Sequence, residues 1–367
     1  MTENLTSILR QRIASDGPLS VADYMQAALL DPDHGYYSTQ EPFGVDGDFI
    51  TAPEISQMFG ELIGLWAAVV WQGLGSPETI ALVELGPGRG SLMSDVLRAS
   101  RAVPDFSSAI EVHVIEASPR LRQIQRETLV GHDITWHDDI EGIPGVPSII
   151  IANEFLDALP IRQIIRAEDG WHERLVDWSG EHERFEWSQG DALTDLARHL
   201  PLPLAEKAKV GDIWEISTTA RHAVTALSKR ISLAGGAALI IDYGYAVSSL
   251  GDTLQAVRNH SSVSVFDAPG SADLTAHVDF AACAEIAAAA GALTHGPTTQ
   301  RAFLRGLGIE LRAARLAAAM KEKQRLEIES ALARLIDPSE MGTLFKVAAM
   351  LSPDAPDVAG FGSGRGD

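Results

Sequence analysis

The chain has 367 residues, of which 46% are hydrophobic and 22% are charged. This is the composition of a folded globular protein with room for about two domains, and it excludes a chain that is mainly disordered. Fifty acidic residues against 29 lysines and arginines give a formal net charge of −21, so we expect no binding to nucleic acid. The single cysteine, Cys283, leaves no internal disulfide and no cysteine cluster, and no metal site is expected.

The amino-terminal residues 1–12 are acidic and polar where a signal peptide has its apolar region, and they lack the bias of a transit peptide. Apolar runs such as 149–152 and 237–241 are far shorter than the roughly 18 residues of a membrane span. The sequence therefore predicts a cytoplasmic protein without a membrane-inserted segment. It makes no prediction about the oligomeric state.

Residues 1–75 have mainly helical patterns and form the first of three predicted parts. Thr51 and Glu54 have the spacing of a capping box, and Pro53 falls in the first turn. One continuous helix is expected to follow and to bury a face that extends to Val69. This part is predicted to be a helical extension that covers a ligand site in the remainder of the chain.

From about residue 76 the pattern changes to short apolar strands that alternate with helices. Strands are predicted at 80–85, 112–115, 134–136, 148–152 and 237–241. Such a pattern implies an α/β fold with a Rossmann-like, doubly wound and mostly parallel sheet. The predicted core covers residues 76–245, and an insertion at about 163–209 is predicted to form a hairpin with a short helix. Residues 246–367 are predicted to add helices, one of them over 309–335, then a late strand and a flexible tail.

The strongest chemical signal is a glycine-rich turn after the first predicted strand, with Glu84, Gly86, Gly88 and Gly90 in the spacing acid-x-Gly-x-Gly-x-Gly. Such a turn between a strand and a helix lets the backbone approach a ligand closely. A dinucleotide fingerprint needs a further glycine where this chain has Ser91. The observed spacing instead resembles the first motif of class I S-adenosylmethionine methyltransferases. A tight turn that binds nothing is the remaining alternative.

Acidic residues end the second and third predicted strands. Glu116 closes the second strand, where a carboxylate accepts hydrogen bonds from ribose hydroxyls in either cofactor class. Asp138 and Asp139 end the third strand, where a methyltransferase meets the adenine amine. The alternative for this pair is a solvated start of a loop.

The fourth predicted strand runs into three polar residues, Asn153, Glu154 and Asp157. In a doubly wound sheet this strand end faces the transferable group. Polar side chains at an apolar strand end are costly unless they bind something. As alternatives, Asp157 caps a following helix and Asn153 binds loop backbone.

At these residues the chain resembles the MidA-like methyltransferases, relatives of the mitochondrial complex I assembly methyltransferase. The matching stretches are residues 47–66, 84–98, 152–161, 242–245, 273–280 and 341–347. They are spread over nearly the whole chain. The sequence departs from the family at Arg301, where a glycine is expected.

The resemblance implies S-adenosylmethionine as the cofactor and a protein arginine as the methyl acceptor, with symmetric dimethylation on a subunit of respiratory complex I. It places at the cofactor the residues Glu84, Gly86, Gly88, Gly90 and Glu116. It places at the acceptor the residues Asn153, Glu154 and Asp157. A cover over the cofactor is expected at 47–57, with four residues nearest to it: Gly47, Asp48, Thr51 and Pro53.

Methyl transfer is a direct displacement in which positioning dominates. An arginine acceptor is always protonated near neutral pH, so carboxylates are needed to pair with it. We expect Glu154 to take this role, with Asp157 as the second candidate and Asn153 as an orienting amide. Three other functions are open: a non-catalytic complex I assembly factor that retains a cofactor site, a methyltransferase for small molecules, and an NAD(P)-dependent oxidoreductase, which Ser91 disfavours.

Overall fold

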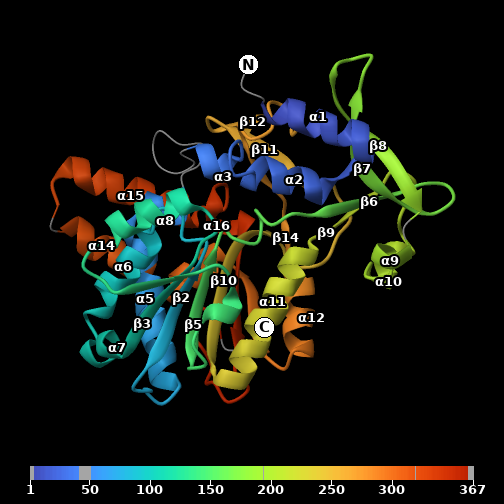
Figure 1. Cartoon of the computed structure of the whole chain (residues 1–367). Coiled ribbons are helices and arrows are strands. Elements are labelled where there is room, and N and C mark those ends of the chain that lie inside the picture. The colour runs from blue at the N-terminus through green and yellow to red at the C-terminus, as the bar shows by residue number, and fades with distance from the viewer. Residues whose placement is uncertain (1–3, 41–50, 193, 319, 363–367) are drawn as a thin grey trace. The chain divides into compact units, whose positions relative to one another are not determined.

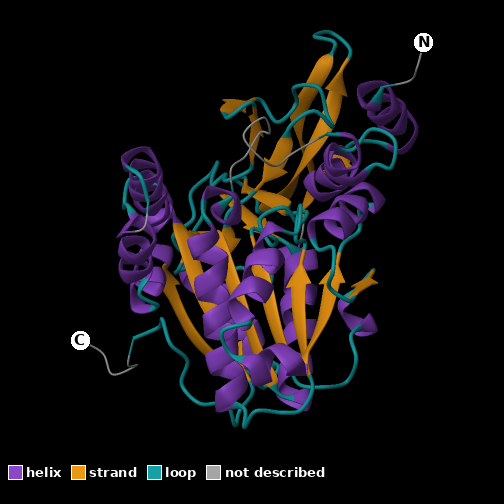
Figure 2. Cartoon of the chain, turned by 90° about the vertical axis from the view of Figure 1, so that its left-hand side faces the viewer, coloured by secondary structure: helices purple, strands orange, loops and turns teal. Residues whose placement is uncertain are grey.

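The computed structural model describes residues 4–40, 51–192, 194–318 and 320–362, which fold into two compact units (Figures 1 and 2). The first unit is Met1–Phe49, Asp157–His222 and Val247–His277. The second unit is Ile50–Leu156, Ala223–Ala246 and Val278–Asp367. Each unit is therefore assembled from segments that are far apart in the sequence, whereas the predicted three parts are continuous stretches of chain.

Among the described residues, the second unit is built on an eight-stranded sheet in the order β15-β16-β10-β5-β2-β3-β4, with β14 beside β10. Its strands are β2 (Ile80–Leu85), β3 (Ile110–Ile115), β4 (Ile134–His137), β5 (Ser148–Asn153), β10 (Gly236–Tyr245), β14 (Val278–Asp279), β15 (Leu293–Thr299) and β16 (Phe345–Leu351). The five strands from β4 to β10 are parallel, and β16 is antiparallel to both neighbours. The predicted α/β, mostly parallel sheet is confirmed.

The central strands are apolar because both of their faces are covered. All six residues of β2 and all six of β5 are buried, as expected of parallel strands between layers of helices. Phe59, Ile63 and Trp66 belong to the same buried cluster as Leu82 and Ile151 of these strands. Figure 2 shows helices packed against this sheet. The continuous apolar runs in the sequence therefore correspond to the middle of the core.

The second unit has helices of one to about five turns between and after these strands. They are α4 (Ala52–Ile55), α5 (Gln57–Gly73), α6 (Ser91–Ser100), α7 (Pro104–Ala109), α8 (Pro119–Thr128), α12 (Phe280–Ala289), α13 (Gln300–Gly306), α14 (Ile309–Ala318), α15 (Glu322–Ile336) and α16 (Met341–Leu344). The helix α11 (Thr218–Ala234) begins in the first unit and continues into the second. Among the described residues, no helix is both long enough and apolar enough to span a membrane.

The single helix predicted after Thr51 is instead two helices, and the predicted capping box is wrong. The Thr51 side chain makes no capping hydrogen bond, and the carboxylate of Glu54 accepts from the Ser91 hydroxyl at 2.5 Å. The chain turns at Ser56, whose side chain accepts from the amide of Met58 at 3.2 Å and caps α5. Serine is a strong N-cap residue, so α4 ends at Ile55 and a new helix begins at Gln57.

Two further helix predictions need correction. Val69, expected on the buried face of α5, is 50% exposed. The helix predicted over 309–335 is divided into α14 and α15, and Lys321 is the N-cap of the second helix. Arg301, the departure from the family pattern, lies in α13 and donates to the carbonyl of Ile336 at 2.8 Å.

The first unit holds two antiparallel sheets in the part of the chain that the structure describes. One has the order β1-β7-β6-β9, with β8 beside β7, and the other has the order β12-β11-β13. The strands are β1 (Leu19–Ser20), β6 (Arg162–Arg166), β7 (Trp171–Ser179), β8 (Arg184–Ala192), β9 (Ile213–Ile216), β11 (Gln255–Arg258), β12 (Ser261–Val263) and β13 (Asp273–Thr275). The pairing of β7 with β8 confirms the predicted hairpin.

Short helices complete the first unit. They are α1 (Leu5–Asp16), α2 (Val21–Leu30), α3 (Tyr36–Thr39), α9 (Thr194–Ala197) and α10 (Leu202–Ala205). Tyr24 of α2 is fully buried, and its hydroxyl donates to the carbonyl of Val265 at 2.8 Å. This bond satisfies the phenol in the core, where an unpaired hydroxyl is costly.

Candidate cofactor and acceptor site

The sheet order of the second unit defines where a ligand is expected. The chain runs from β2 through β3 to β4 on one side of the sheet, and then from β5 to β10 on the other side. The strands β2 and β5 are parallel neighbours. The chain leaves their carboxyl ends in opposite directions along the sheet, from β2 toward β3 and from β5 toward β10. Open α/β sheets bind ligands at such a switch point. The glycine-rich turn follows β2, Asn153 is the last residue of β5, and Glu154 comes directly after it.

The glycine-rich turn has a backbone that other residues rarely adopt. Gly86, Gly88 and Gly90 have φ values of 58°, 54° and 86°, all in the left-handed region that glycine tolerates best. A Cβ atom on Gly86 would lie 2.9 Å from the Phe155 ring. The turn ends at Ser91, the first residue of α6. The conformation of this turn at the end of β2 thus requires glycine.

Glu84, the residue before the end of β2, is a buried acid with an incomplete set of hydrogen bonds. Its side chain is 3% exposed and accepts a hydrogen bond from the amide of Met93. Among the described residues, no group donates to its Oε2 atom. Burial raises the pKa of Glu84 to about 8, although the Met93 amide lowers it. A buried carboxyl oxygen without a donor favours a ligand that brings a donor or a positive charge.

Glu116 follows the carboxyl end of β3 and is held by donors on both oxygens. Its Oε1 accepts from the amide of Ser118 at 2.8 Å, and its Oε2 accepts from the side-chain amide of Gln125 at 3.0 Å. Burial raises the pKa of Glu116, and these two bonds lower it. The Ala117 amide is a further donor, so the carboxylate is fixed in place, and it retains an acceptor position for a hydroxyl donor.

Asp138 and Asp139 are exposed and have structural partners in the described chain. Asp138 pairs with the Arg122 guanidinium at 2.6 Å. Asp139 caps the 3₁₀ helix Ile140–Gly142, since its carboxylate accepts from the amide of Gly142 at 3.0 Å. These contacts favour the alternative of a loop start. The adenine role of the pair stays a prediction.

Glu154 is the most unusual residue at the end of β5. Its φ of 49° is left-handed, which costs about 1–3 kcal/mol for a residue with a side chain. Its Oε1 atom accepts from the amide of Ala52 at 3.3 Å and from the Asn153 side-chain amide at 3.2 Å. Among the described residues, no group donates to the buried Oδ1 atom of Asn153. Strained, oriented polar groups of this kind cluster at functional sites.

Asp242, on β10, orders the segment that follows β5. Its side chain is completely buried. One carboxylate oxygen accepts from the amide of Leu156, and the other accepts from the amide of Tyr243, both at 3.0 Å. Because β10 is the parallel neighbour of β5, Asp242 fixes the chain just after Glu154.

Asp157 belongs to the first unit, not to the unit that contains Asn153 and Glu154. It is 5% exposed, and its carbonyl accepts from the amide of Ala276 at 3.0 Å. The pKa of Tyr37 is raised mainly by burial, next by the charge of Asp273, and then by the charge of Asp157. The element that follows Asp157 in the chain is the strand β6, not a helix. The alternative that Asp157 caps a helix is therefore wrong.

The predicted cover is described in part. Gly47 and Asp48 lie outside the described residues. Thr51 and Pro53 lie at the start of α4, whose Glu54 accepts from the hydroxyl of Ser91 next to the glycine-rich turn. This bond ties α4 to the start of α6 within the second unit.

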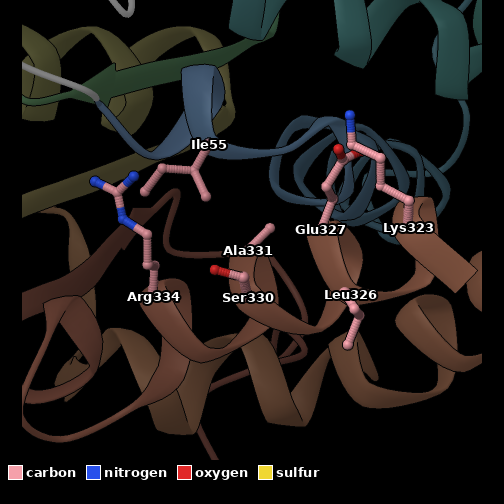
Figure 3. Close-up of a pocket in the computed structure, with 7 residues that line it drawn as sticks. All are labelled: Ile55, Lys323, Leu326, Glu327, Ser330, Ala331 and Arg334. Carbon is pink, nitrogen blue, oxygen red and sulfur yellow. The ribbon is translucent and has the colours of Figure 1, made fainter.

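A pocket of about 440 Å³ lies between α4 and α15 (Figure 3). Its lining residues are Ile55, Lys323, Leu326, Glu327, Ser330, Ala331 and Arg334. None of the predicted cofactor or acceptor residues is among them. The chemistry at the switch point is therefore a better guide to the site than this pocket.

Sequence reasoning missed one residue in contact with the site. Gln125 of α8 is fully buried and bonds to both Gly88 and Glu116. The signal for it was present in the sequence. It is a polar residue four positions after Leu121 and four before Leu129, on what is otherwise an apolar helix face.

Comparison with known proteins supports the geometric argument. Residues 62–298 match a family described as "Putative S-adenosyl-L-methionine-dependent methyltransferase". A Danio rerio protein named protein arginine methyltransferase NDUFAF7, mitochondrial, is 37% identical over 96% of this chain and 88% of its own length. The Homo sapiens protein of that name is 34% identical over 94% of this chain and 82% of its own length.

Two solved structures are similar to this chain over nearly its whole length. A COG1565 superfamily member from Burkholderia thailandensis, bound to S-adenosyl-homocysteine, has a TM-score of 0.85 and 31% identity, with 99% of this chain and 95% of that chain covered. A native crystal structure of a COG1565 superfamily protein from the same organism has a TM-score of 0.82 and 30% identity, with the same coverage.

The fold and the glycine-rich turn define a class I methyltransferase that uses S-adenosylmethionine. The chain belongs to the matched family of S-adenosyl-L-methionine-dependent methyltransferases, and the resemblance to MidA-like proteins is confirmed. The predicted cofactor is confirmed as well, and the dinucleotide alternative is not supported.

The predicted cytoplasmic location is contradicted, because the curated relatives are named as mitochondrial proteins. The prediction was wrong because its observations were not specific. A single cysteine fits any reducing compartment, and the absence of a long apolar run excludes only a membrane span.

Proposed function

We propose that this protein transfers methyl groups from S-adenosylmethionine to a protein arginine, giving symmetric dimethylarginine on a subunit of respiratory complex I. The observation that carries the proposal is Glu154, a strained carboxylate oriented by Asn153 and by the amide of Ala52 at the switch point. The names of the relatives, protein arginine methyltransferase, support the choice of acceptor. The resemblance to the complex I assembly methyltransferase supports the choice of partner.

The residues present fit the cofactor. The left-handed turn of Gly86, Gly88 and Gly90 allows close approach of its backbone. Glu116 presents a fixed carboxylate for the ribose hydroxyls, and Glu84 has a buried oxygen without a donor. When bound, the cofactor supplies an electrophilic methyl group on a positively charged sulfur.

The acceptor residues hold and orient the arginine. The carboxylate of Glu154 pairs with the guanidinium, which is protonated near neutral pH before the reaction. It would accept the proton that the attacking nitrogen gives up as the nitrogen–methyl bond forms and the methyl–sulfur bond breaks. Asn153 keeps that carboxylate in one orientation. Asp157 is the second carboxylate in the proposal. The contacts of Glu154 and Asn153 give the arginine a fixed line of approach.

The proposed function is tested with purified protein, methyl-labelled S-adenosylmethionine, and complex I subunits from cells that lack this protein. Label in arginine of one subunit is the expected result. Tight cofactor binding without label in any subunit would favour a non-catalytic assembly factor. Label in a small metabolite alone would favour a small-molecule methyltransferase.

Replacing Glu116 by alanine is expected to raise the Kd of S-adenosylmethionine at least about tenfold. The change leaves the ribose hydroxyls without their acceptor, a loss of roughly 1–3 kcal/mol. Isothermal titration measures the Kd, and Glu111→Ala is the matched control, because Glu111 is an exposed acid on the same strand β3. An unchanged Kd in Glu116→Ala would move the ribose site elsewhere.

Cofactor affinity is expected to rise with pH up to about 8. The pKa of Glu84 is about 8 because the side chain is buried, so the ligand-free carboxyl is mostly protonated at pH 7. A cationic ligand favours the ionised carboxylate, and binding should therefore release a proton. Titration at pH 7 in two buffers of different ionisation enthalpy counts the protons. Glu84→Gln should release fewer, and equal release in both proteins would contradict this role.

A further inference from the structure

Gln125 is a buried amide in the helix beside the glycine-rich turn. It lies on α8, and its side chain has no exposed surface. It is flanked on the same helix face by Leu121 and Leu129, which are also buried. Burying an amide costs free energy unless its donors and acceptor are satisfied. The contacts of Gln125 therefore define what it does.

The side chain of Gln125 makes hydrogen bonds to two residues of the proposed cofactor site and to one residue that orients the amide. The Nε2 group donates to the carbonyl oxygen of Gly88 at 2.8 Å and to the Oε2 atom of Glu116 at 3.0 Å. The Oε1 atom accepts from the indole Nε1 of Trp136 at 2.9 Å. One amide thus joins the middle of the glycine-rich turn to the acid after β3.

The orientation of this amide is determined by its partners. The indole of Trp136 only donates, whereas the Gly88 carbonyl and the Glu116 carboxylate accept here. Exchanging the oxygen and nitrogen of Gln125 would place donor against donor and acceptor against acceptor. Trp136 therefore fixes which end of the amide faces the turn.

We propose that Gln125 is a positioning residue for ribose recognition, which holds the Glu116 carboxylate at a fixed place relative to the glycine-rich turn. This inference rests on the proposed role of Glu116 at the ribose. The Ser118 amide binds Oε1 of Glu116, Gln125 binds Oε2, and the Ala117 amide is a further donor to the carboxylate. Both oxygens are therefore fixed, and of the roughly four acceptor positions of a carboxylate one is left for a hydroxyl. Without Gln125 the carboxylate can turn and the Gly88 carbonyl loses a partner.

The test compares two ligands and measures Kd by isothermal titration. The ligands are S-adenosylhomocysteine and its analogue lacking both ribose hydroxyls. The main variant is Gln125→Met, which keeps the length of the side chain but removes the amide. Gln123→Met is the matched control, because Gln123 is exposed on the same helix and its side-chain amide donates to the carboxylate of Glu127 at 3.0 Å. Thermal unfolding of each variant reports on the fold.

Gln125→Met is expected to raise the Kd of S-adenosylhomocysteine about tenfold and the Kd of the dideoxy analogue by less than about threefold. Gln123→Met should change neither. A purely structural role would weaken both ligands by the same factor, and that result would overturn the inference. An unchanged Kd for S-adenosylhomocysteine would overturn it as well.

A second variant keeps the inference testable if Gln125→Met does not fold. Trp136→Phe leaves Gln125 in place but removes the donor that orients it. The Kd of S-adenosylhomocysteine should again rise more than the Kd of the dideoxy analogue, but by a smaller factor than in Gln125→Met. Equal losses for both ligands again overturn the inference.

The ribose assignment itself is checked separately with Glu116→Ala. If that variant binds S-adenosylhomocysteine as wild type does, the proposed role of Glu116 fails and the inference fails with it. If Glu116→Ala weakens binding while Gln125→Met weakens both ligands equally, only the inference about Gln125 fails. In the double variant, adding Gln125→Met to Glu116→Ala should cause little further loss.

Discussion

Replacing Gly88 by valine is expected to abolish S-adenosylmethionine binding, with a Kd at least about a hundredfold higher. Gly88 has a φ of 54°, a conformation that a β-branched residue adopts only with strain. Its carbonyl is also anchored by Gln125. Valine therefore either adds a side chain at the face of the turn or moves the turn away from the end of β2. A loss of about 2.7 kcal/mol corresponds to a hundredfold change in Kd.

The matched control for this change is Gly131→Val. Gly131 also has a left-handed backbone, with a φ of 89°, and a Cβ atom there would meet no atom within 4 Å. Both variants carry backbone strain, but only Gly88 lies in the glycine-rich turn. Isothermal titration and thermal unfolding separate the loss of a site from the loss of the fold. Wild-type affinity in a folded Gly88→Val protein would contradict the cofactor assignment.

Replacing Glu154 by glutamine is expected to reduce methyl transfer at least about a hundredfold while cofactor affinity changes little. Glutamine keeps the size of the side chain and can still accept from the amide of Ala52, but it has no charge to pair with a guanidinium. Loss of one oriented electrostatic contact in a transition state costs about 10²–10³ in rate. Single-turnover transfer to the protein substrate, with Kd measured beside it, gives both quantities.

Two comparisons sharpen that experiment. Glu111→Gln makes the same chemical change at an exposed position of β3 and should leave transfer unchanged. Asp157→Asn should reduce transfer less than Glu154→Gln does, because Asp157 is the second carboxylate in the proposal. Turnover at the wild-type rate in Glu154→Gln would refute its catalytic role. A loss of cofactor affinity in that variant would place Glu154 in the cofactor site instead.

The parts of the fold that could be predicted are those with a local signal. The runs at 80–85 and 148–152 are apolar apart from Glu84 and Ser148, and they lie in β2 and β5 at the centre of the sheet. The glycine-rich turn was predictable because left-handed backbone at Gly86, Gly88 and Gly90 restricts the residue type. Sequence periodicity and turn chemistry were sufficient for these elements.

The parts that were missed depend on contacts between distant segments. Ser91 was read only as an exception to the dinucleotide pattern, yet its hydroxyl binds Glu54, 37 residues away in sequence. The position of Gln125 on an apolar helix face was visible in the sequence, but its role was not, because its partners Gly88 and Trp136 are brought together only when the sheet forms. The first unit draws on three separate stretches of chain, and no local pattern in any one of them indicates the others.

The most direct measurement is mass spectrometry of arginine residues in complex I subunits from three kinds of cells. One kind lacks this protein, one has the wild type restored, and one has Gly88→Val restored. The account predicts symmetric dimethylarginine at an arginine of one subunit with the wild type, and the unmodified residue in the other two. The same arginine modification pattern in all three would contradict the proposal that this protein methylates complex I.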